Sequence, residues 1–387
     1  MGARQHLAII GDGAVAAAFL SVARLVPGDR LTLIGPNVHR FGAGRFYADH
    51  DARHPWRLAY LLDRPNGEMT EGFADWLAAE WPVLLPEIAV AQPLHVRRWS
   101  EALSEGAFGD FAAPRAIYGR YLARRSSERL AKLVEDGVQV QLITGLATDL
   151  SRADDQFRIT LASGEVIKAD RVDVATGGPA NQRFGVDAGP TAFTTLYDNE
   201  EAIARVLKPG WEVTCLGAST EVLDVMHFLR AAWPTQELRL RVLRDRATPA
   251  LDGDPEYRRL RAAGRIVEEV GRPIWVYAES AGNVRLRITG KECQSQEKTV
   301  PLAINTAGPG DQLLVDFLVS GMIAKGWLKL NSAQNRIDVG ARFATDMDGV
   351  RYASDAVAIL NRRPEGVVRQ RVEELVGSFE GDPIETA

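Results

Sequence analysis

The stretch HLAIIGDGAVAAAFL, residues 6–20, constrains the fold more than any other part of the chain. Residues 6–10 predict a short buried strand, and the small residues from Ala14 to Ala23 predict a helix. Gly11 and Gly13 therefore stand in a strand-to-helix turn, with the small Ala16 at the third position of a dinucleotide-binding fingerprint. Unpaired N–H groups at the start of such a helix attract a pyrophosphate. An ordinary glycine turn of an α/β protein is the alternative.

The end of the next strand lacks the residue that such a site usually has. Residues 30–34 continue a βαβ unit, but Gly35, Pro36 and Asn37 follow where an Asp or Glu would bind an adenosine ribose. Asn37 is the nearest polar side chain that could replace this acid, although it could equally be a turn residue. A Gly35→Glu substitution is therefore expected to tighten nucleotide binding. Asp12 is expected to point away from the phosphates, because its charge would repel them.

The pattern repeats further along the chain. Residues 212–216 predict a strand that meets Gly217 and Ser219, and a helix is predicted to begin near Thr220. The following strand ends with Arg244 and Arg246, where an acidic residue would favour NAD and an arginine favours the 2′-phosphate of NADP. Two such units predict two nucleotides, the second being NADPH, with NADH also possible in principle. A solvated strand end is the alternative for both arginines.

Composition narrows the class of partner. The chain has 387 residues, of which 25% are charged and 46% hydrophobic, and its net charge is −5. These values are ordinary for a globular protein of about two domains and give no basic surface for nucleic acid. Since no apolar run is long enough to span a membrane, we expect a cytoplasmic protein that acts on a small molecule, with a homodimer as one option.

Cysteine and histidine exclude two kinds of site. Cys215 and Cys293 are the only cysteines and are far apart in the sequence, so disulfide-reductase chemistry is not expected. His50 and His54 have the spacing of metal ligands on a helix, but Pro55 disfavours a helix there, and we expect no metal site.

The remaining chain predicts interleaved domains. Residues 115–135 have the spacing of an amphipathic helix that Gly137 ends. Residues 138–175 alternate like the strands of a β-meander, with a turn at residues 163–165. A third region begins with a buried strand in residues 299–305 and continues as a helix and a strand. The expected fold class is α/β, with two Rossmann-like dinucleotide-binding domains and a β-meander.

In the order of these motifs the chain resembles the two-dinucleotide-binding-domain flavoproteins, the glutathione-reductase-like FAD/NAD(P) oxidoreductases. Within them it is similar to a bacterial family of FAD/NAD(P)-binding proteins that carries a Gly-x-Gly-x-x-Tyr stretch and a PRxxYGxYL-like helix. The residues that match these two stretches are Gly42, Gly44 and Tyr47, and Pro114, Arg115, Tyr118, Gly119 and Tyr121.

The resemblance implies further site residues. Residues 175–177 and 306–308 resemble the turns at which such chains cross between domains, which implicates Thr176, Gly177 and Gly308. Residues 343–357 resemble the closing motif in which an Asp binds the flavin ribityl chain. Asp355 matches that Asp, whereas Ser354 replaces a glycine near the pyrophosphate. FAD binding is implied, weakened by the departures at residues 35 and 354.

The resemblance also implies a function and a domain division. It implies an FAD-dependent oxidoreductase or monooxygenase that uses NAD(P)H to reduce the flavin and acts on a small molecule, with no catalytic side chain identified. A degenerate binding or partner subunit and an NAD(P)-only dehydrogenase are the alternatives. The FAD domain is expected in residues 1–190 and 301–387 and the NAD(P) domain in residues 191–300.

The expected cofactor-binding residues are Gly11, Gly13, Ala14, Val15, Asn37, Gly42, Gly44, Arg45, Thr176, Gly177, Gly217, Ser219, Arg244, Arg246, Gly308, Ser354 and Asp355. Arg45, Arg53 and Arg57 lie in the segment that passes near the flavin in the similar family. One of them could meet the pyrophosphate or an anionic substrate, although solvated arginines are the plainer expectation.

Overall fold

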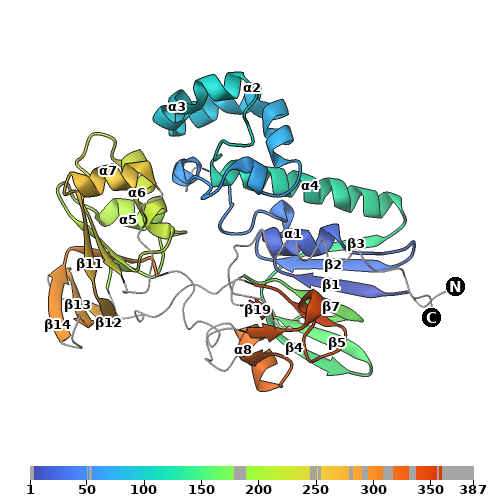
Figure 1. Ribbon diagram of the computed structural model, residues 1–387. Helices are drawn as coiled ribbons and strands as arrows, with labels where there is room; N and C mark the ends of the chain where they lie inside the picture. The colour runs from blue at the N-terminus through green and yellow to red at the C-terminus, as the bar shows by residue number, and fades with distance from the viewer. Residues whose placement is uncertain are drawn as a thin grey trace.

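The computed structural model describes residues 4–49, 51, 55–177, 189–244, 251, 254–278, 282–289, 295–307, 317–330, 337–354 and 357–359. Two parallel sheets organise this part of the chain (Figure 1). We call the sheet that contains β1, with the elements packed on it, the first unit, and the sheet that contains β9, with its helices, the second unit.

The first unit has a five-stranded sheet in the order β18-β7-β1-β2-β3. All neighbours in it are parallel. The sheet is buried, since Ile9, Leu31 and Val174 are each 0% exposed. Its strands and first helix are β1 His6–Ile10, β2 Arg30–Gly35, β3 Gln139–Thr144, β7 Arg171–Val174, β18 Val350–Tyr352 and α1 Ala14–Ser21. The strand, turn and helix order predicted around Gly11 is therefore present.

The second unit repeats this arrangement with a sheet in the order β11-β10-β9-β15-β8, again with parallel neighbours. Its strands are β8 Ala192–Phe193, β9 Val213–Leu216, β10 Leu240–Arg244, β11 Ile266–Val270 and β15 Leu302–Asn305. Its helices are α5 Glu200–Val206, α6 Glu221–Ala232 and α7 Pro255–Ala262. An antiparallel sheet of β12 Arg272–Ala278, β13 Val284–Thr289 and β14 Ser295–Val300 completes it.

The predicted meander is smaller than expected. It consists of β4 Ala147–Ala153, β5 Gln156–Leu161 and β6 Val166–Ala169, with antiparallel neighbours. β3 and β7, which we expected within it, pair in parallel with β2 and β1 instead. For β3 the reason is that α4, Arg115–Glu135, carries the chain back across the sheet, as a parallel pair requires. Nearby lie α8 Phe317–Ala324, β16 Lys329–Leu330, β17 Ile337–Val339, η5 Ala341–Phe343 and β19 Val357–Ile359.

A helical insertion separates β2 from β3. It contains η1 Val38–Arg40, η2 Pro55–Ala59, η3 Asn66–Glu68, α2 Phe73–Ala91, α3 Pro93–Ser104 and α4 Arg115–Glu135. Figure 1 shows α4 beside α1, with α2 and α3 further from the first sheet. The bounds of α4 are those predicted from its spacing.

The two stretches that carried the family resemblance pack against each other. The rings of Tyr47 and Tyr118 meet edge to face, with centroids 5.0 Å apart. A Cβ on Gly119 would overlap the carbonyl oxygen of Tyr47, and a Cβ on Gly42 would lie 3.0 Å from Leu122 O. These glycines allow the 42–47 loop to lie directly on α4.

The expected α/β class, with two Rossmann-like units and a β-meander, is confirmed. The first sheet takes β18 from the last third of the chain, whereas β15, just beyond the expected boundary at residue 300, lies in the second sheet. The domain limits themselves stay a prediction. Within the described residues, no helix combines the length and the apolar character needed to cross a membrane.

The contact between α4 and the 42–47 loop gives a test of the fold. Alanine normally stabilises a helix interior relative to glycine by about 0.5–1 kcal/mol. At residue 119 we expect the reverse, a loss of about 1–3 kcal/mol, because the new methyl group must displace the Tyr47 carbonyl. Urea unfolding of Gly119→Ala measures this.

Gly321→Ala is the matched control, since Gly321 also lies inside a helix but its Cβ would meet only the end of the Asp149 side chain, at 3.4 Å. It should be neutral or stabilising. A Gly119→Ala protein as stable as Gly321→Ala would contradict the described packing.

Candidate functional site

The two glycine turns have the same backbone geometry. Gly11 has φ +117° and Gly217 has φ +118°. Gly11 N donates to Ile34 O and Gly217 N to Leu243 O, both at 2.8 Å. A Cβ on either glycine would overlap the chain that follows a neighbouring strand, at Ala175 and Ala307 respectively. Only glycine fits there, so each turn leaves its sheet in the tight path that a dinucleotide fingerprint predicts.

The N-terminus of α1 is open to an anion. Gly13 precedes the helix in an extended conformation, no side chain caps the helix, and its first turn holds no acidic residue. The N–H groups of a first helical turn have no partner within the helix, and they carry the positive end of its dipole. A Cβ on Gly13 would find only Gly44 Cα, at 3.9 Å. The backbone here fits the approach of a phosphate, which a side chain at residue 13 would block.

The glycine-rich stretch at residues 42–44 of the insertion packs against the backbone of this turn. Gly42 N and Gly44 N both donate to Asp12 O, at 2.8 and 3.1 Å. Gly44 has φ +53°, and a Cβ on it would lie 2.7 Å from Gly13 Cα. The structure thus brings together the expected residues Gly13, Gly42 and Gly44, which are distant in the sequence.

The end of β2 differs from expectation. The carboxylate of Asp12 lies over Gly35, so a Cβ on Gly35 would be 2.7 Å from Asp12 Cβ. Asp12 Oδ2 also accepts a hydrogen bond from Asn37 N at 2.5 Å. Burial raises the pKa of Asp12, while the Asn37 hydrogen bond acts in the opposite direction. The expectation that Gly35→Glu tightens binding meets a steric obstacle, because the glutamate would collide with Asp12 in its present position.

The segments that follow β7 and β18 lie next to the first turn, at the carboxyl ends of the strands. Ala175 N donates to Ile10 O at 2.7 Å. A Cβ on Gly11 would lie 3.3 Å from Thr176 N, so Thr176 lies beside Gly11 and Gly177 follows it in the chain. Ala353 N donates to Val174 O at 3.0 Å. Ser354 follows and is 1% exposed, with Oγ 2.8 Å from Tyr352 Oη. Asp355, Arg246 and Gly308 lie outside the described residues.

Polar side chains surround the second turn. Ser219 Oγ accepts a hydrogen bond from Glu221 N at 3.2 Å, at the start of α6. Burial raises the pKa of Glu221 to about 7, although hydrogen bonds from Leu196 N and Thr195 Oγ1 favour its charged form. Arg244, expected to bind a 2′-phosphate, has its Nε 3.3 Å from Glu268 Oε2 on β11. A phosphate at Arg244 would have to compete with that carboxylate.

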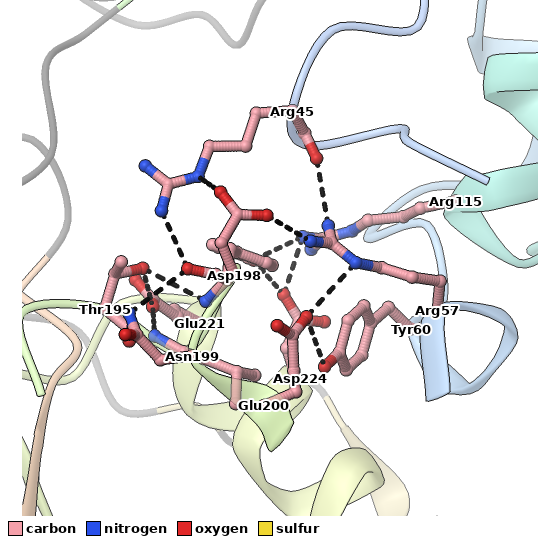
Figure 2. Close-up of polar contacts among 12 residues, drawn as sticks. Arg45, Arg57, Tyr60, Arg115, Thr195, Asp198, Asn199, Glu200, Glu221 and Asp224 are labelled. Atoms are coloured by element: carbon pink, nitrogen blue, oxygen red, sulfur yellow. Dashed lines mark hydrogen bonds and ion pairs between the residues drawn. The ribbon is translucent and has the colours of Figure 1, made fainter. Parts of the chain in front are cut away.

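Charged side chains join the two units (Figure 2). Arg57 of η2 sets its Nη2 2.8 Å from Asp198 Oδ1 and its Nε 3.1 Å from Glu200 Oε1. Arg45 also pairs with Asp198, at 2.5 Å, and donates from Nη2 to Tyr197 O at 2.7 Å. The inter-unit cluster comprises these residues and three more, namely Tyr60, Arg115 and Asp224.

The second half of the inter-unit cluster centres on Asp224 of α6. Arg115 Nη1 lies 2.6 Å from Asp224 Oδ2 and donates to Tyr197 Oη at 2.9 Å. The Tyr197 hydroxyl in turn donates to Asp224. Burial is the largest single influence and disfavours the Arg115 cation, but the charge of Asp224 together with smaller contributions from Tyr197, Tyr47 and Asp63 raises the pKa of Arg115. Burial and the same charge raise the pKa of Tyr197, so its hydroxyl keeps the proton that it donates.

The cluster corrects one expectation and adds residues that the sequence did not indicate. Arg57 is not a solvated arginine, since its side chain is 3% exposed. Arg45, expected at the cofactor, directs its guanidinium towards the second unit. The added residues are Asp198, Glu200 and Asp224. Their partners are more than 100 positions away in the sequence, so no local pattern marks them.

A protein family matches part of the chain in sequence. Residues 8–179 match a protein family described as FAD-NAD(P)-binding. A search of the curated proteins finds no match.

Several solved structures share the fold over nearly the whole chain. Thioredoxin reductase from Lactococcus lactis is 13% identical, with 97% of this chain and 99% of that chain covered and a TM-score of 0.54. Lysine monooxygenase from Nocardia farcinica is also 13% identical, with the same coverage and a TM-score of 0.62. Ornithine N-hydroxylase from Kutzneria sp. 744 is 12% identical, with 98% and 99% covered and a TM-score of 0.55.

The inter-unit cluster gives a test by substitution. Arg57→Met removes the cation from a buried site and leaves Glu200, whose side chain is 1% exposed, without its charge partner. Breaking a buried pair in this way costs about 3–5 kcal/mol. We expect a loss of this size in urea unfolding.

Arg124→Met is the control, because Arg124 is 53% exposed where it pairs with Glu80. Exposed pairs contribute about 0–1 kcal/mol. Equal losses for the two variants would show that the cluster does not hold the units as described.

Proposed function

We propose that this protein, which has the fold of the two-domain FAD/NAD(P) flavoproteins, is a flavin-dependent oxidoreductase that takes reducing equivalents from NAD(P)H and acts on a small molecule. The observation that carries the proposal is the repeated glycine turn, with the same φ angle and the same strand-to-strand hydrogen bond in both units. Such a repeat provides one nucleotide site in each unit.

The proposal places FAD at the first turn. Gly11 and Gly13 let the backbone approach the pyrophosphate, and the N–H groups of Ala14 and Val15 donate to it. The other residues assigned to this site are Asn37, Gly42, Gly44, Thr176, Gly177, Ser354 and Asp355. When bound, FAD supplies the hydride-transfer chemistry, so the chain has to position the nucleotides and needs no acid-base pair of its own.

The second turn is assigned to the nicotinamide nucleotide. Gly217 gives the tight turn and Ser219 faces the start of α6. Arg244 and Arg246 favour NADPH over NADH. Because Arg244 is paired with Glu268, its part in NADPH binding requires that pair to open or to share the guanidinium.

The two cysteines of this chain indicate which of the reactions of the similar structures it can carry out. Disulfide reduction in such enzymes needs a reactive thiol, but Cys215 is 0% exposed in β9, and burial raises the pKa of its thiol. Cys293, the other cysteine, has no partner at CxxC spacing. These features favour hydroxylation or dehydrogenation of a small molecule over disulfide reduction. A cytoplasmic location and a homodimer are further proposals that rest on composition alone.

Gly13→Val tests the FAD site. Gly13 has φ −89°, which other residues adopt, and its Cβ would meet no protein atom closer than 3.9 Å. The variant should therefore fold while its side chain occupies the pyrophosphate position. We expect wild type to bind FAD and Gly13→Val to lose FAD binding, measured by flavin fluorescence, at an unchanged melting temperature.

Gly109→Val is the matched control, since its Cβ would also meet only a glycine Cα, that of Gly67, at 3.9 Å. It should bind FAD as wild type does. Full FAD occupancy in Gly13→Val would refute the assignment of the first turn, and failure of wild type to bind FAD would favour the degenerate subunit or the NAD(P)-only enzyme.

A further inference from the structure

We propose that Asp12 is the carboxylate that binds the adenosine ribose of FAD, in place of the acidic residue that is missing at the end of β2. The inference rests on the proposed function, since it requires FAD at the first glycine turn. Dinucleotide folds usually supply this carboxylate from the strand that follows the first helix. Here the glycine turn itself supplies it.

The main evidence is that Asp12 and residue 35 compete for one space. A Cβ on Gly35 would lie 2.7 Å from Asp12 Cβ, 2.8 Å from Oδ2 and 2.9 Å from Cγ. Gly35 is not among the residues with positive φ, so its backbone conformation does not require glycine. What requires glycine is the room that the Asp12 side chain occupies. The end of β2 therefore keeps a carboxylate, which comes from residue 12.

The carboxylate of Asp12 is held in a fixed position. Its Oδ2 accepts a hydrogen bond from Asn37 N at 2.5 Å, and the residue is 8% exposed. Its main-chain oxygen accepts from Gly42 N and Gly44 N. A carboxylate offers about four acceptor positions, so one bond from Asn37 leaves capacity for ribose hydroxyls.

The direction of the side chain removes the conflict between its charge and the pyrophosphate. Asp12 turns towards the end of β2, whereas the pyrophosphate is assigned to the N-terminus of α1. Negative charge at the ribose also repels a 2′-phosphate. Asp12 thereby selects FAD over NADPH at the first turn, and the two nucleotides are directed to different units.

Asp12→Asn tests the assignment, because an asparagine oxygen can still accept the hydrogen bond from Asn37 N while the charge is gone. We expect FAD and ADP to bind this variant roughly 10- to 100-fold more weakly than wild type, the loss of hydrogen bonds to a charged group. Wild type should prefer ADP over 2′-deoxy-ADP, and Asp12→Asn should bind the two alike. Flavin fluorescence and titration calorimetry measure these affinities.

Asp29→Asn is the matched control. Asp29 is 4% exposed in the same unit and accepts hydrogen bonds from Gln5 N and Val26 N, at 3.0 and 2.9 Å. It thus has the same structural role as Asp12 in holding a loop, but it lies away from the proposed ribose. It should keep wild-type affinity for FAD and the preference for ADP.

A transplant of the carboxylate gives a second, independent readout. Asp12→Gly removes the carboxylate, and Gly35→Asp alone makes two side chains compete for one space. Both single variants should bind FAD weakly. The double variant Asp12→Gly/Gly35→Asp should recover affinity to within a few-fold of wild type.

The outcomes separate this inference from the proposed function. If wild type binds neither FAD nor ADP, both fail. If wild type binds FAD but Asp12→Asn binds it equally well, or still prefers ADP over 2′-deoxy-ADP, the role of Asp12 is refuted and the flavin function stands. Weak binding by the double variant would likewise count against the shared space as the ribose site.

Discussion

The first unit depends on the close contact between Gly11 and the main chain at Ala175. A side chain at residue 11 would overlap the Ala175 carbonyl, and the turn holds its place through the bond from Gly11 N to Ile34 O. This path brings the start of α1 above the sheet, at the carboxyl ends of the parallel strands, where open α/β sheets bind ligands. Gly217 repeats the constraint at Ala307 in the second unit.

Two kinds of contact then relate the other parts of the chain to these turns. Glycines at residues 42, 44 and 119 allow the insertion to lie against the first turn and α4. The inter-unit cluster holds the second unit with buried charges, of which Arg57 and Asp224 are almost fully covered. Buried ion pairs add little net stability, but they penalise any arrangement that leaves one partner unpaired. They therefore favour one relative placement of the units.

The sequence predicted those features whose causes are local. Periodicity placed α4 at Arg115–Glu135, and the glycine spacing located both turns. The strand pattern of the sequence misplaced β3, since a strand's partner depends on the crossover that precedes it. The sequence also did not predict the burial of Arg57, or that the Asp12 side chain occupies the space next to Gly35. Each of these depends on contacts between residues that are distant in the sequence. The missing acid at residue 35 was visible in the sequence, but its replacement was not.

Anaerobic reduction of the flavin-loaded wild type by NADPH tests most directly the claim that both units bind a nucleotide and work together. In a stopped-flow mixture without substrate or oxygen, the account predicts that NADPH bleaches the flavin absorbance and that NADH does so more slowly. Flavin that stays oxidised with both NADPH and NADH would contradict it.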